Sequence, residues 1–274
     1  MSVTGEQAIA ARFVAARRAG EGFDDYPGEP PASLADAYAI QAHAAALRGG
    51  AIGGWKIGRI ADAAAATFGA NRLAGPIFAD TIVDNGGEDT PMAVIGDGFA
   101  AAEAEFLLRL GALPDPLPAC WSIDDARAVV SDVAIGIEIA SSPLRAINDL
   151  GPAVTVSDFG NNNGLLVGAA IPPDRAHKLD AIPVSLAIDG RTAGAGDTST
   201  MLDGPYGAVR FLLELAGRQG LTVREGQWVS TGAVTGVHRV APGARVVATF
   251  GELTLAATIV DQAVASGGAI DATA

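Results

Sequence analysis

Lysine and cysteine are nearly absent from this chain of 274 residues. The single cysteine, Cys120, cannot form an internal disulfide or a cysteine-rich zinc site, so nothing indicates an oxidising compartment. Only two of the 18 basic residues are lysines, Lys56 and Lys178, and the others are arginines. A lysine in an apolar segment of such a chain indicates chemistry that needs a titratable amine.

Positive charge as a whole is also scarce. The 31 acidic residues outnumber the 18 basic ones, which gives a net charge of −13. This balance argues against binding to nucleic acid or to anionic membranes, because both depend on lysine and arginine. The N-terminus lacks a basic segment before an apolar core, and the apolar stretch at 165–171 is far below the roughly 20 residues that span a bilayer. We expect a cytoplasmic protein.

Short apolar runs alternate with turns rich in glycine, asparagine and aspartate, and a few helical segments flank them. Helices are predicted at 6–19, from the N-cap Ser33 to about residue 47, and at 61–67, 123–130, 143–148 and 205–219. Strands are predicted at 55–57, 77–79, 93–95, 133–140, 184–188, 228–230, 245–250 and 253–260.

Residues 100–110 are ambiguous. Their alanines, glutamates and leucines favour a helix by intrinsic propensity. In a helix Glu103 and Glu105 would point roughly 200° apart, whereas in a strand both side chains lie on the same face.

Glu138 lies on a strand face among small residues, where a carboxylate must be paired, protonated or bound to a metal. If Glu103 and Glu105 lie on a neighbouring strand, three carboxylates converge and need a cation. Oxygen ligands without histidine or cysteine suit Mg²⁺ or Mn²⁺. The alternative is that Glu103 and Glu105 lie on a solvated helix and that Glu138 pairs with an arginine.

Two further segments carry candidate functional residues. Lys56 lies in Gly53-Gly-Trp-Lys-Ile-Gly58, where an apolar environment would lower its pKa and make it a usable acid or base, unless it reaches water at a sheet edge. The segment 158–164 contains Asp158, Asn161 and Asn162 between glycines and can present a carboxylate and amides to a polar ligand, unless it is a plain turn.

Together these segments resemble the 2-keto-4-pentenoate hydratase / 4-oxalocrotonate decarboxylase family of the fumarylacetoacetate hydrolase-like superfamily. The resemblance extends over almost the whole chain. It includes the segments 34–38, 54–58, 75–80, 103–105, 137–139, 158–163, 230–236 and 250–253.

The resemblance implies an α+β fold with a β-roll core and flanking helices, divided into an N-terminal α/β region (1–85) and a catalytic domain (86–274), and it places Glu103 and Glu105 on a strand. It implies that Glu103, Glu105 and Glu138 hold Mg²⁺ or Mn²⁺. It also implies that Lys56, Asp80 and Asp158 are catalytic and that the protein is a homo-oligomer.

Two positions depart from the family pattern. Arg59 occupies a position that is usually apolar or Thr/Ser, and 158–163 reads Asp-Phe-Gly-Asn-Asn-Asn instead of a sequence close to Asp-Asn-Ala-Ser-Ser-Gly. We hypothesise that Arg59 binds a second substrate carboxylate, because arginine suits bidentate carboxylate recognition. A solvent-facing Arg59 is the alternative. Asn161 and Asn162 are the remaining candidates for substrate binding.

The activity implied is metal-dependent hydration of a 2-hydroxy-2,4-dienoate, which gives a 4-hydroxy-2-oxo acid in aromatic catabolism. A decarboxylase of the same family is the main alternative, and a carbon–carbon hydrolase ranks lower because no histidine is well placed to activate water. A non-catalytic small-molecule-binding protein on the same fold is the alternative outside enzymes.

Overall fold

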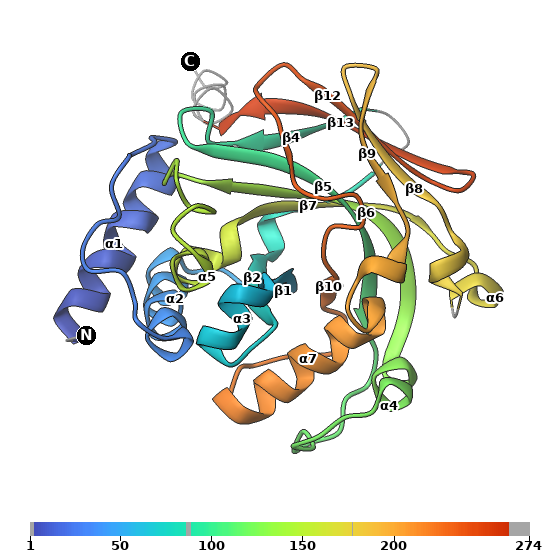
Figure 1. Ribbon diagram of the computed structural model, residues 1–274, viewed down its shortest axis with the longest axis horizontal. Helices are drawn as coiled ribbons and strands as arrows, with labels where there is room; N and C mark the ends of the chain where they lie inside the picture. The colour runs from blue at the N-terminus through green and yellow to red at the C-terminus, as the bar shows by residue number, and fades with distance from the viewer. Residues whose placement is uncertain (1–2, 86–88, 177, 263–274) are drawn as a thin grey trace, which may run out of the picture.

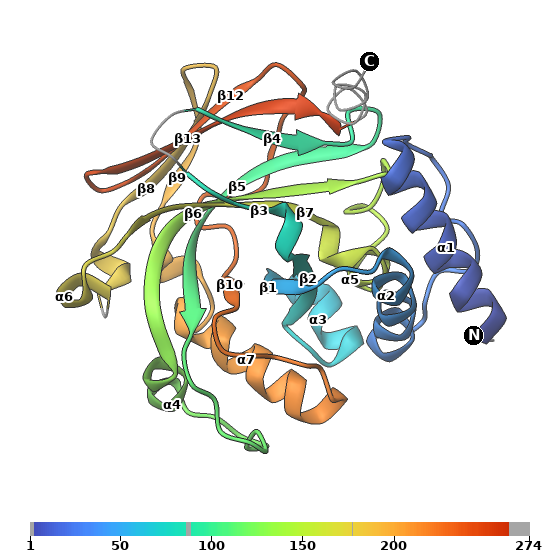
Figure 2. The same ribbon diagram turned by 180° about the vertical axis from the view of Figure 1, so that it is seen from behind.

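Two curled β-sheets form the centre of the molecule, and most of the helices lie around the concave side of the larger sheet (Figures 1 and 2). The computed structural model describes residues 3–85, 89–176 and 178–262. The mixture of helices and sheets confirms the expected α+β class. No helix in the described ranges is long and apolar enough to cross a membrane.

The larger sheet has the strand order β2-β1-β10-β5-β6-β7-β3, and β11 pairs with β5 outside this path. Its strands are β1 (Ile52–Arg59), β2 (Arg72–Phe78), β3 (Ile82–Asp84), β5 (Phe99–Leu110), β6 (Val130–Ser142), β7 (Asn162–Ala170), β10 (Trp228–Ser230) and β11 (His238–Arg239). The second sheet has the order β4-β13-β12-β8-β9. Its strands are β4 (Thr90–Val94), β8 (Val184–Ile188), β9 (Arg191–Gly196), β12 (Arg245–Phe250) and β13 (Leu253–Asp261).

Seven α-helices and four short 3₁₀ turns are found in the described ranges. The helices are α1 (Val3–Ala19), α2 (Leu34–Arg48), α3 (Asp62–Phe68), α4 (Ile123–Ala128), α5 (Pro152–Ser157), α6 (Pro173–Ala176) and α7 (Gly204–Gln219). The 3₁₀ turns are η1 (Ala79–Thr81), η2 (Phe159–Asn161), η3 (Leu179–Ala181) and η4 (Thr198–Thr200).

The helix with the clearest sequence signals forms as predicted. Ser33 is the N-cap of α2, and its hydroxyl accepts the backbone N–H of Asp36 at 3.1 Å. The cap supplies a partner to one of the four N–H groups that a helix start leaves unpaired. The helix ends at Gly49, whose φ of 71° suits a residue without a Cβ.

The ambiguous segment 100–110 lies within strand β5, and eleven of its twelve residues are buried. One face of β5 packs against the second sheet, where the rings of Phe106 and Phe250 meet edge-on with centroids 5.2 Å apart. Burial on both faces stabilises a strand here more than helix propensity favours a helix. Glu103 and Glu105 therefore lie on the same face of a strand.

The helix predicted at 143–148 is wrong, because these residues form turns. The hydroxyl of Ser142 accepts the N–H of Leu144 at 3.1 Å, and Leu144 forms a bridge with Phe23. These local bonds replace the partners that a helix would supply. The helix in this region is α5, which begins after Gly151 with Pro152 in its first turn.

The first 85 residues contribute strands β1, β2 and β3 to the larger sheet together with strands from the rest of the chain. The division into regions 1–85 and 86–274 stays a prediction. What matters for the site is the central part of this sheet, where β1, β10, β5 and β6 lie side by side.

Candidate metal centre and substrate cavity

Three glutamates converge at the centre of the larger sheet. Glu103 on β5 lies directly opposite Glu138 on β6, and Glu105 is two residues further along the same face of β5. One oxygen from each of the three carboxylates lies within 4.8 Å of the others. All three side chains are buried, with exposed fractions of 4% for Glu103 and 0% for the other two.

Lys56 on β1 faces this cluster. Its Nζ donates a hydrogen bond to Oε2 of Glu138 at 3.1 Å and lies 3.9 Å from Oε1 of Glu103. The residue opposite Lys56 on β2 is Gly75. A Cβ added at Gly75 would lie 2.0 Å from the carbonyl oxygen of Phe159, so only glycine lets β2 approach the segment that follows α5.

Glu105 is held by groups from the end of strand β10 and the following loop. Its Oε2 accepts from the hydroxyl of Ser230 at 2.5 Å and from the backbone N–H of Gly232 at 2.9 Å. Its Oε1 is buried and has no hydrogen-bond partner in the described part of the chain. A buried carboxylate oxygen without a donor is costly unless it is protonated or bound to a cation.

Burial raises the pKa of Glu105 well above the usual carboxylate range, and the charges of Glu138 and Glu103 add to this, against a lowering by Lys56 and Ser230. Burial also raises the pKa of Glu138 to about 7. Lys56 pulls the pKa of Glu138 down, Glu103 pushes it up, and the hydrogen bond from Asn162 again lowers it. Three ionised glutamates would carry more negative charge than one ammonium group can balance, and the raised pKa values mean that Glu105 and Glu138 take up protons more readily than usual.

The pKa of Lys56 moves in the direction opposite to the one expected from its apolar surroundings. Burial does lower this pKa, but the attraction of Glu103, Glu138 and Glu105 outweighs burial, and the net shift is upward. The sequence-based prediction of a lowered pKa considered the apolar neighbours alone and missed the facing carboxylates. Lys56 carries its proton in this arrangement.

The cluster fits a divalent cation on its own chemistry. It offers three carboxylates without nitrogen or sulfur ligands, one of their oxygens lacks a partner, and two of the carboxylates have raised pKa values. Hard oxygen donors of this kind suit Mg²⁺, Mn²⁺ or Ca²⁺. Glu103, Glu105 and Glu138 are the side chains that can hold such an ion.

A cavity of about 680 Å³ opens beside the cluster, and both Lys56 and Glu103 are part of its wall. Asn161 lines it as well, in a left-handed backbone conformation with φ 68°. The amide of Asn161 donates to Oδ1 of Asn148 at 3.3 Å, and its own buried Oδ1 has no partner within the described ranges. This oxygen is free to accept a hydrogen bond from a bound molecule.

Two arginines contribute positive charge to the same cavity. Arg59 is exposed at the end of β1 and pairs with Asp62 at 3.1 Å. Arg72, its neighbour across the β1–β2 pair, is 4% exposed and contacts Asp203 at 2.5 Å. The cavity thus has the carboxylate cluster at one side and guanidinium groups at another, which suits an elongated anion.

Asn162 supports the carboxylate cluster. Its Nδ2 donates to Oε1 of Glu138 at 2.8 Å, so it orients one of the candidate metal ligands. The structure places it against Glu138 and outside the cavity that Asn161 lines.

The two candidate catalytic aspartates lie outside this cavity. Asp158 is fully buried and accepts two hydrogen bonds from Arg17, at 2.6 and 2.8 Å, and one from Ser142 at 2.6 Å. Asp80 is exposed, pairs with Arg48 at 2.7 Å, and lines a different cavity. The structure brings Lys56 to the glutamate cluster, places Asn161 and Arg59 in the wall of the cavity beside it, and leaves these two aspartates outside that cavity.

Sequence reasoning missed several residues of the site. Ser230 and Gly232 belong to a segment that carried the family resemblance, and that signal pointed to them without giving them a role. Arg72 and Asn148 had no such signal, because only the folded sheet brings them to the cavity.

Comparison with known proteins shows which solved structures share this fold. No protein-family model matches the sequence, and no curated protein matches it significantly. Among solved structures, 4-oxalocrotonate decarboxylase from Pseudomonas putida G7, complexed with magnesium and adipate, is similar with a TM-score of 0.79 at 21% identity, covering 95% of this chain and 99% of that chain. The same decarboxylase complexed with calcium and acetate gives a TM-score of 0.77 at 22% identity, with the same coverage.

Fumarylpyruvate hydrolase from Pseudomonas aeruginosa, in complex with Mn²⁺ and pyruvate, is similar over 76% of this chain and 89% of its own, with a TM-score of 0.57 at 19% identity. Similarity at such identities establishes the fold. The expected fumarylacetoacetate hydrolase-like fold is therefore confirmed.

Proposed function

We propose that this chain is a metal-dependent lyase of the 2-keto-4-pentenoate hydratase / 4-oxalocrotonate decarboxylase family and that it hydrates a 2-hydroxy-2,4-dienoate. The observation that carries the proposal is the buried cluster of Glu103, Glu105 and Glu138, in which Oε1 of Glu105 has no partner in the described part of the chain and Lys56 donates to Glu138. The similar structures, which hold magnesium, calcium or manganese together with small carboxylic acids, support a cation at this cluster.

The proposed reaction adds one water molecule in two stages. The 2-hydroxyl loses its proton and C5 gains one, which gives a 2-oxo-3-enoate. Water then adds its oxygen to C4, and C3 takes up a proton, which gives the 4-hydroxy-2-oxo acid. A divalent cation at the cluster would supply Lewis-acid stabilisation of the negative charge that develops on the enol oxygen.

The residues of the chain would bind, orient and exchange protons. Lys56 Nζ lies in the cavity wall next to the glutamates and would pass a proton to or from the bound acid. Asn161 Oδ1 would accept a hydrogen bond from a hydroxyl or water at the other side. Arg59 and Arg72 would bind a distal carboxylate, which favours a dicarboxylic substrate.

Decarboxylation is the second candidate activity. The structural similarity to a 4-oxalocrotonate decarboxylase over almost the full length of both chains favours it. The distal carboxylate would leave as CO₂, and the electrons of the broken bond would move into the dienolate. The same cluster serves this reaction, because the negative charge again develops at the 2-oxo group.

An ultraviolet assay separates the two activities. The purified protein with Mg²⁺ or Mn²⁺ is given 2-hydroxypenta-2,4-dienoate or 2-oxo-hex-3-enedioate. A hydratase removes the dienol absorbance of the first compound, whereas a decarboxylase releases CO₂ from the second.

The role of Arg59 is tested by comparing kcat/KM of the wild type and Arg59→Ala on mono- and dicarboxylic dienoates. An equal loss on both substrates would reject its proposed role.

A non-catalytic binding protein is separated from an enzyme by Glu103→Gln combined with Glu105→Gln. An enzyme of the proposed kind loses both metal retention and turnover in this double variant. The exposed Glu252→Gln is the matched control and should change neither. Small-molecule binding that persists unchanged without metal would favour a binding protein.

Light scattering of the purified wild-type protein tests the prediction of a homo-oligomer.

A further inference from the structure

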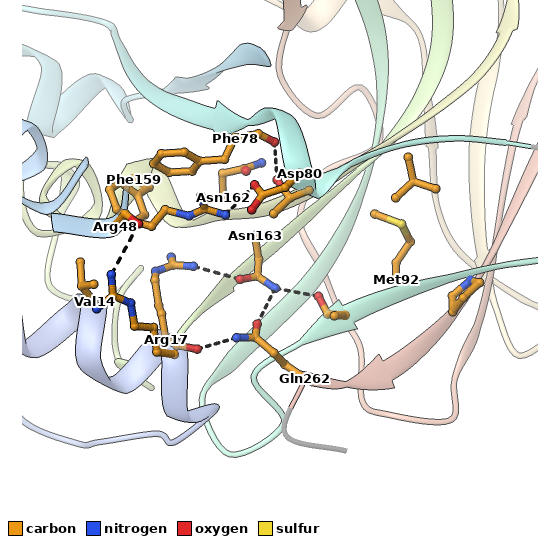
Figure 3. Close-up of a pocket in the computed structure, with 15 residues that line it drawn as sticks. Val14, Arg17, Arg48, Phe78, Asp80, Met92, Phe159, Asn162, Asn163 and Gln262 are labelled. Atoms are coloured by element: carbon orange, nitrogen blue, oxygen red, sulfur yellow. Dashed lines mark hydrogen bonds and ion pairs between the residues drawn. The ribbon is translucent and has the colours of Figure 1, made fainter. Parts of the chain in front are cut away.

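A second cavity, of about 600 Å³, lies where the C-terminal ends of α1 and α2 meet strand β4 (Figure 3). None of the residues that line it lines the cavity beside Lys56. Its wall combines aromatic and aliphatic side chains with the guanidinium groups of Arg17, Arg18 and Arg48. The proposed function makes no use of this cavity.

The positive charge in this cavity is only partly balanced. Arg17 is neutralised by the buried Asp158, which accepts from both its Nε and one Nη. Arg48 faces Asp80, whose side chain is 67% exposed. Arg18 donates to the backbone carbonyl of Leu47, and no acidic side chain in the described part of the chain lies within salt-bridge distance of it. Among the described residues, Arg48 is therefore paired with one exposed carboxylate and Arg18 with none.

The arginines lie beside an apolar wall. The guanidinium carbon of Arg48 is 3.8 Å from the ring centroid of Phe78, and that of Arg17 is 5.2 Å from the ring of Phe159. The two rings meet edge-on at 5.1 Å. Figure 3 shows these four side chains together on one side of the cavity, with Met92 across from them. A ligand that fits needs an anionic head and a flat or aliphatic body.

We propose that this cavity is a second binding site, for a small amphipathic carboxylate whose anionic group is bound by Arg18 and Arg48 and whose body packs on the wall that includes Phe78. The bound carboxylate would take the place of Asp80 on Arg48. Bidentate guanidinium–carboxylate pairing and burial of the apolar body both favour the complex.

One residue, Asn162, connects this cavity to the glutamate cluster. Asn162 lines the second cavity and donates to Oε1 of Glu138. Its neighbour Asn163 accepts from Arg17 at 3.0 Å and also lines the cavity. A carboxylate bound here would change the environment of Asn162 and, through it, the orientation of Glu138, so the site would be regulatory.

Benzoate is a suitable probe, and benzyl alcohol is its uncharged control. Binding is measured by calorimetry in EDTA, so that neither the metal nor turnover contributes. We expect saturable binding of benzoate with one molecule per chain and no measurable binding of benzyl alcohol. Absence of benzoate binding under these conditions would overturn the proposal, whatever the outcome of the activity assays.

Substitutions locate the binding. Arg18→Gln and Arg48→Gln should each weaken benzoate binding about tenfold, because each removes a charge-assisted hydrogen bond. Arg12→Gln is the matched control, since Arg12 lies on the same helix and also packs on an aromatic ring, that of Phe23, outside the cavity. Equal binding by all three variants would overturn the proposed position.

Asp80→Asn provides a test that loss of folding cannot mimic. This change removes the carboxylate that competes for Arg48, and benzoate affinity should rise about two- to fivefold. Unchanged or weaker binding would contradict the proposed competition.

The link to Glu138 is tested by Mn²⁺ affinity. Saturating benzoate should shift this affinity in the wild type and not in Asn162→Ala. The same shift in both proteins would overturn the link.

Discussion

Glu103 and Glu138 face each other across the β5–β6 pair, and Lys56 from a third strand lies within 3.9 Å of both carboxylates. Two like charges at directly opposed positions of a sheet destabilise the pair unless a cation lies between them. One lysine cannot balance three buried glutamates. The predictions that concern the cluster follow from this imbalance, which either protons or a bound cation can relieve.

The stability of the metal-free protein should fall as pH rises. Burial raises the pKa of Glu138 to about 7, above the value of an unfolded glutamate, so the native state binds more protons between these two values. The free energy of unfolding should therefore decrease from about pH 4.5 to about pH 7, by up to about 1.4 kcal/mol per pH unit. Urea unfolding in EDTA across this range measures it.

Glu138→Gln is the control for this pH dependence, because the amide does not titrate. The variant should show a flatter stability profile over the same range, and added Mg²⁺ should flatten the profile of the wild type. A wild-type profile that rises with pH in EDTA would contradict the shift of the Glu138 pKa.

Lys56→Met should strongly destabilise the metal-free protein, since it leaves three buried carboxylates without their cation. Removing one partner of a buried ion pair costs about 3–5 kcal/mol. The other lysine, Lys178, lies on the surface, so Lys178→Met should change the free energy of unfolding by less than about 0.5 kcal/mol. Thermal unfolding in EDTA compares the two, and Mg²⁺ should restore part of the loss in Lys56→Met. Similar stabilities of the two variants would refute the buried ion pair.

Asp158→Asn distinguishes a structural aspartate from a catalytic one. Asp158 is completely buried and accepts two hydrogen bonds from Arg17, so the change should cost about 3–5 kcal/mol of unfolding free energy. The exposed pair between Arg245 and Asp89 is the control, and Arg245→Gln should cost at most about 1 kcal/mol. A stable, folded Asp158→Asn protein with abolished turnover would instead support the catalytic role implied by the family resemblance.

Asn162→Ala should weaken metal binding and leave the fold intact. The amide of Asn162 orients Glu138, and loss of a group that supports a metal ligand typically lowers metal affinity about 10–100-fold. Mn²⁺ titration followed by electron paramagnetic resonance measures the change. Ser199→Ala is the control. Ser199 is an exposed polar residue that does not contact the three glutamates, so the change should leave Mn²⁺ affinity at the wild-type value.

Local sequence signals were sufficient for some elements and insufficient for others. Helix α2 followed from its Ser33 cap and Gly49 end, because capping depends on neighbouring residues alone. Strand β5 did not follow from its own residues, because its alanines and glutamates favour a helix and only burial between two layers decides otherwise. The turns at 143–148 were mistaken for a helix because their partner, Phe23, is distant in sequence.

The candidate site divides in the same way. Period-two alternation puts Glu103 and Glu105 on one face only if their segment is a strand, and the family resemblance supplied that strand. Arg17 could not be recognised as the partner of Asp158, since 141 residues separate them. Sequence reasoning also treated the apolar neighbours of Lys56 as its whole environment, and the pKa direction it predicted was therefore opposite to the one in the fold.

The amino-acid sequence by itself determined the acidic balance and the helix that begins at Ser33, because these depend on composition and on neighbouring residues. The α+β class and the grouping of the three carboxylates came from the resemblance of its segments to a known family. The tertiary structure decided which charges face one another. It placed Lys56 against the glutamates, Asp158 against Arg17, and Asp80 in a separate cavity with Arg48. Pairing between distant strands sets these distances, and electrostatic interactions depend on distance and burial in the folded chain.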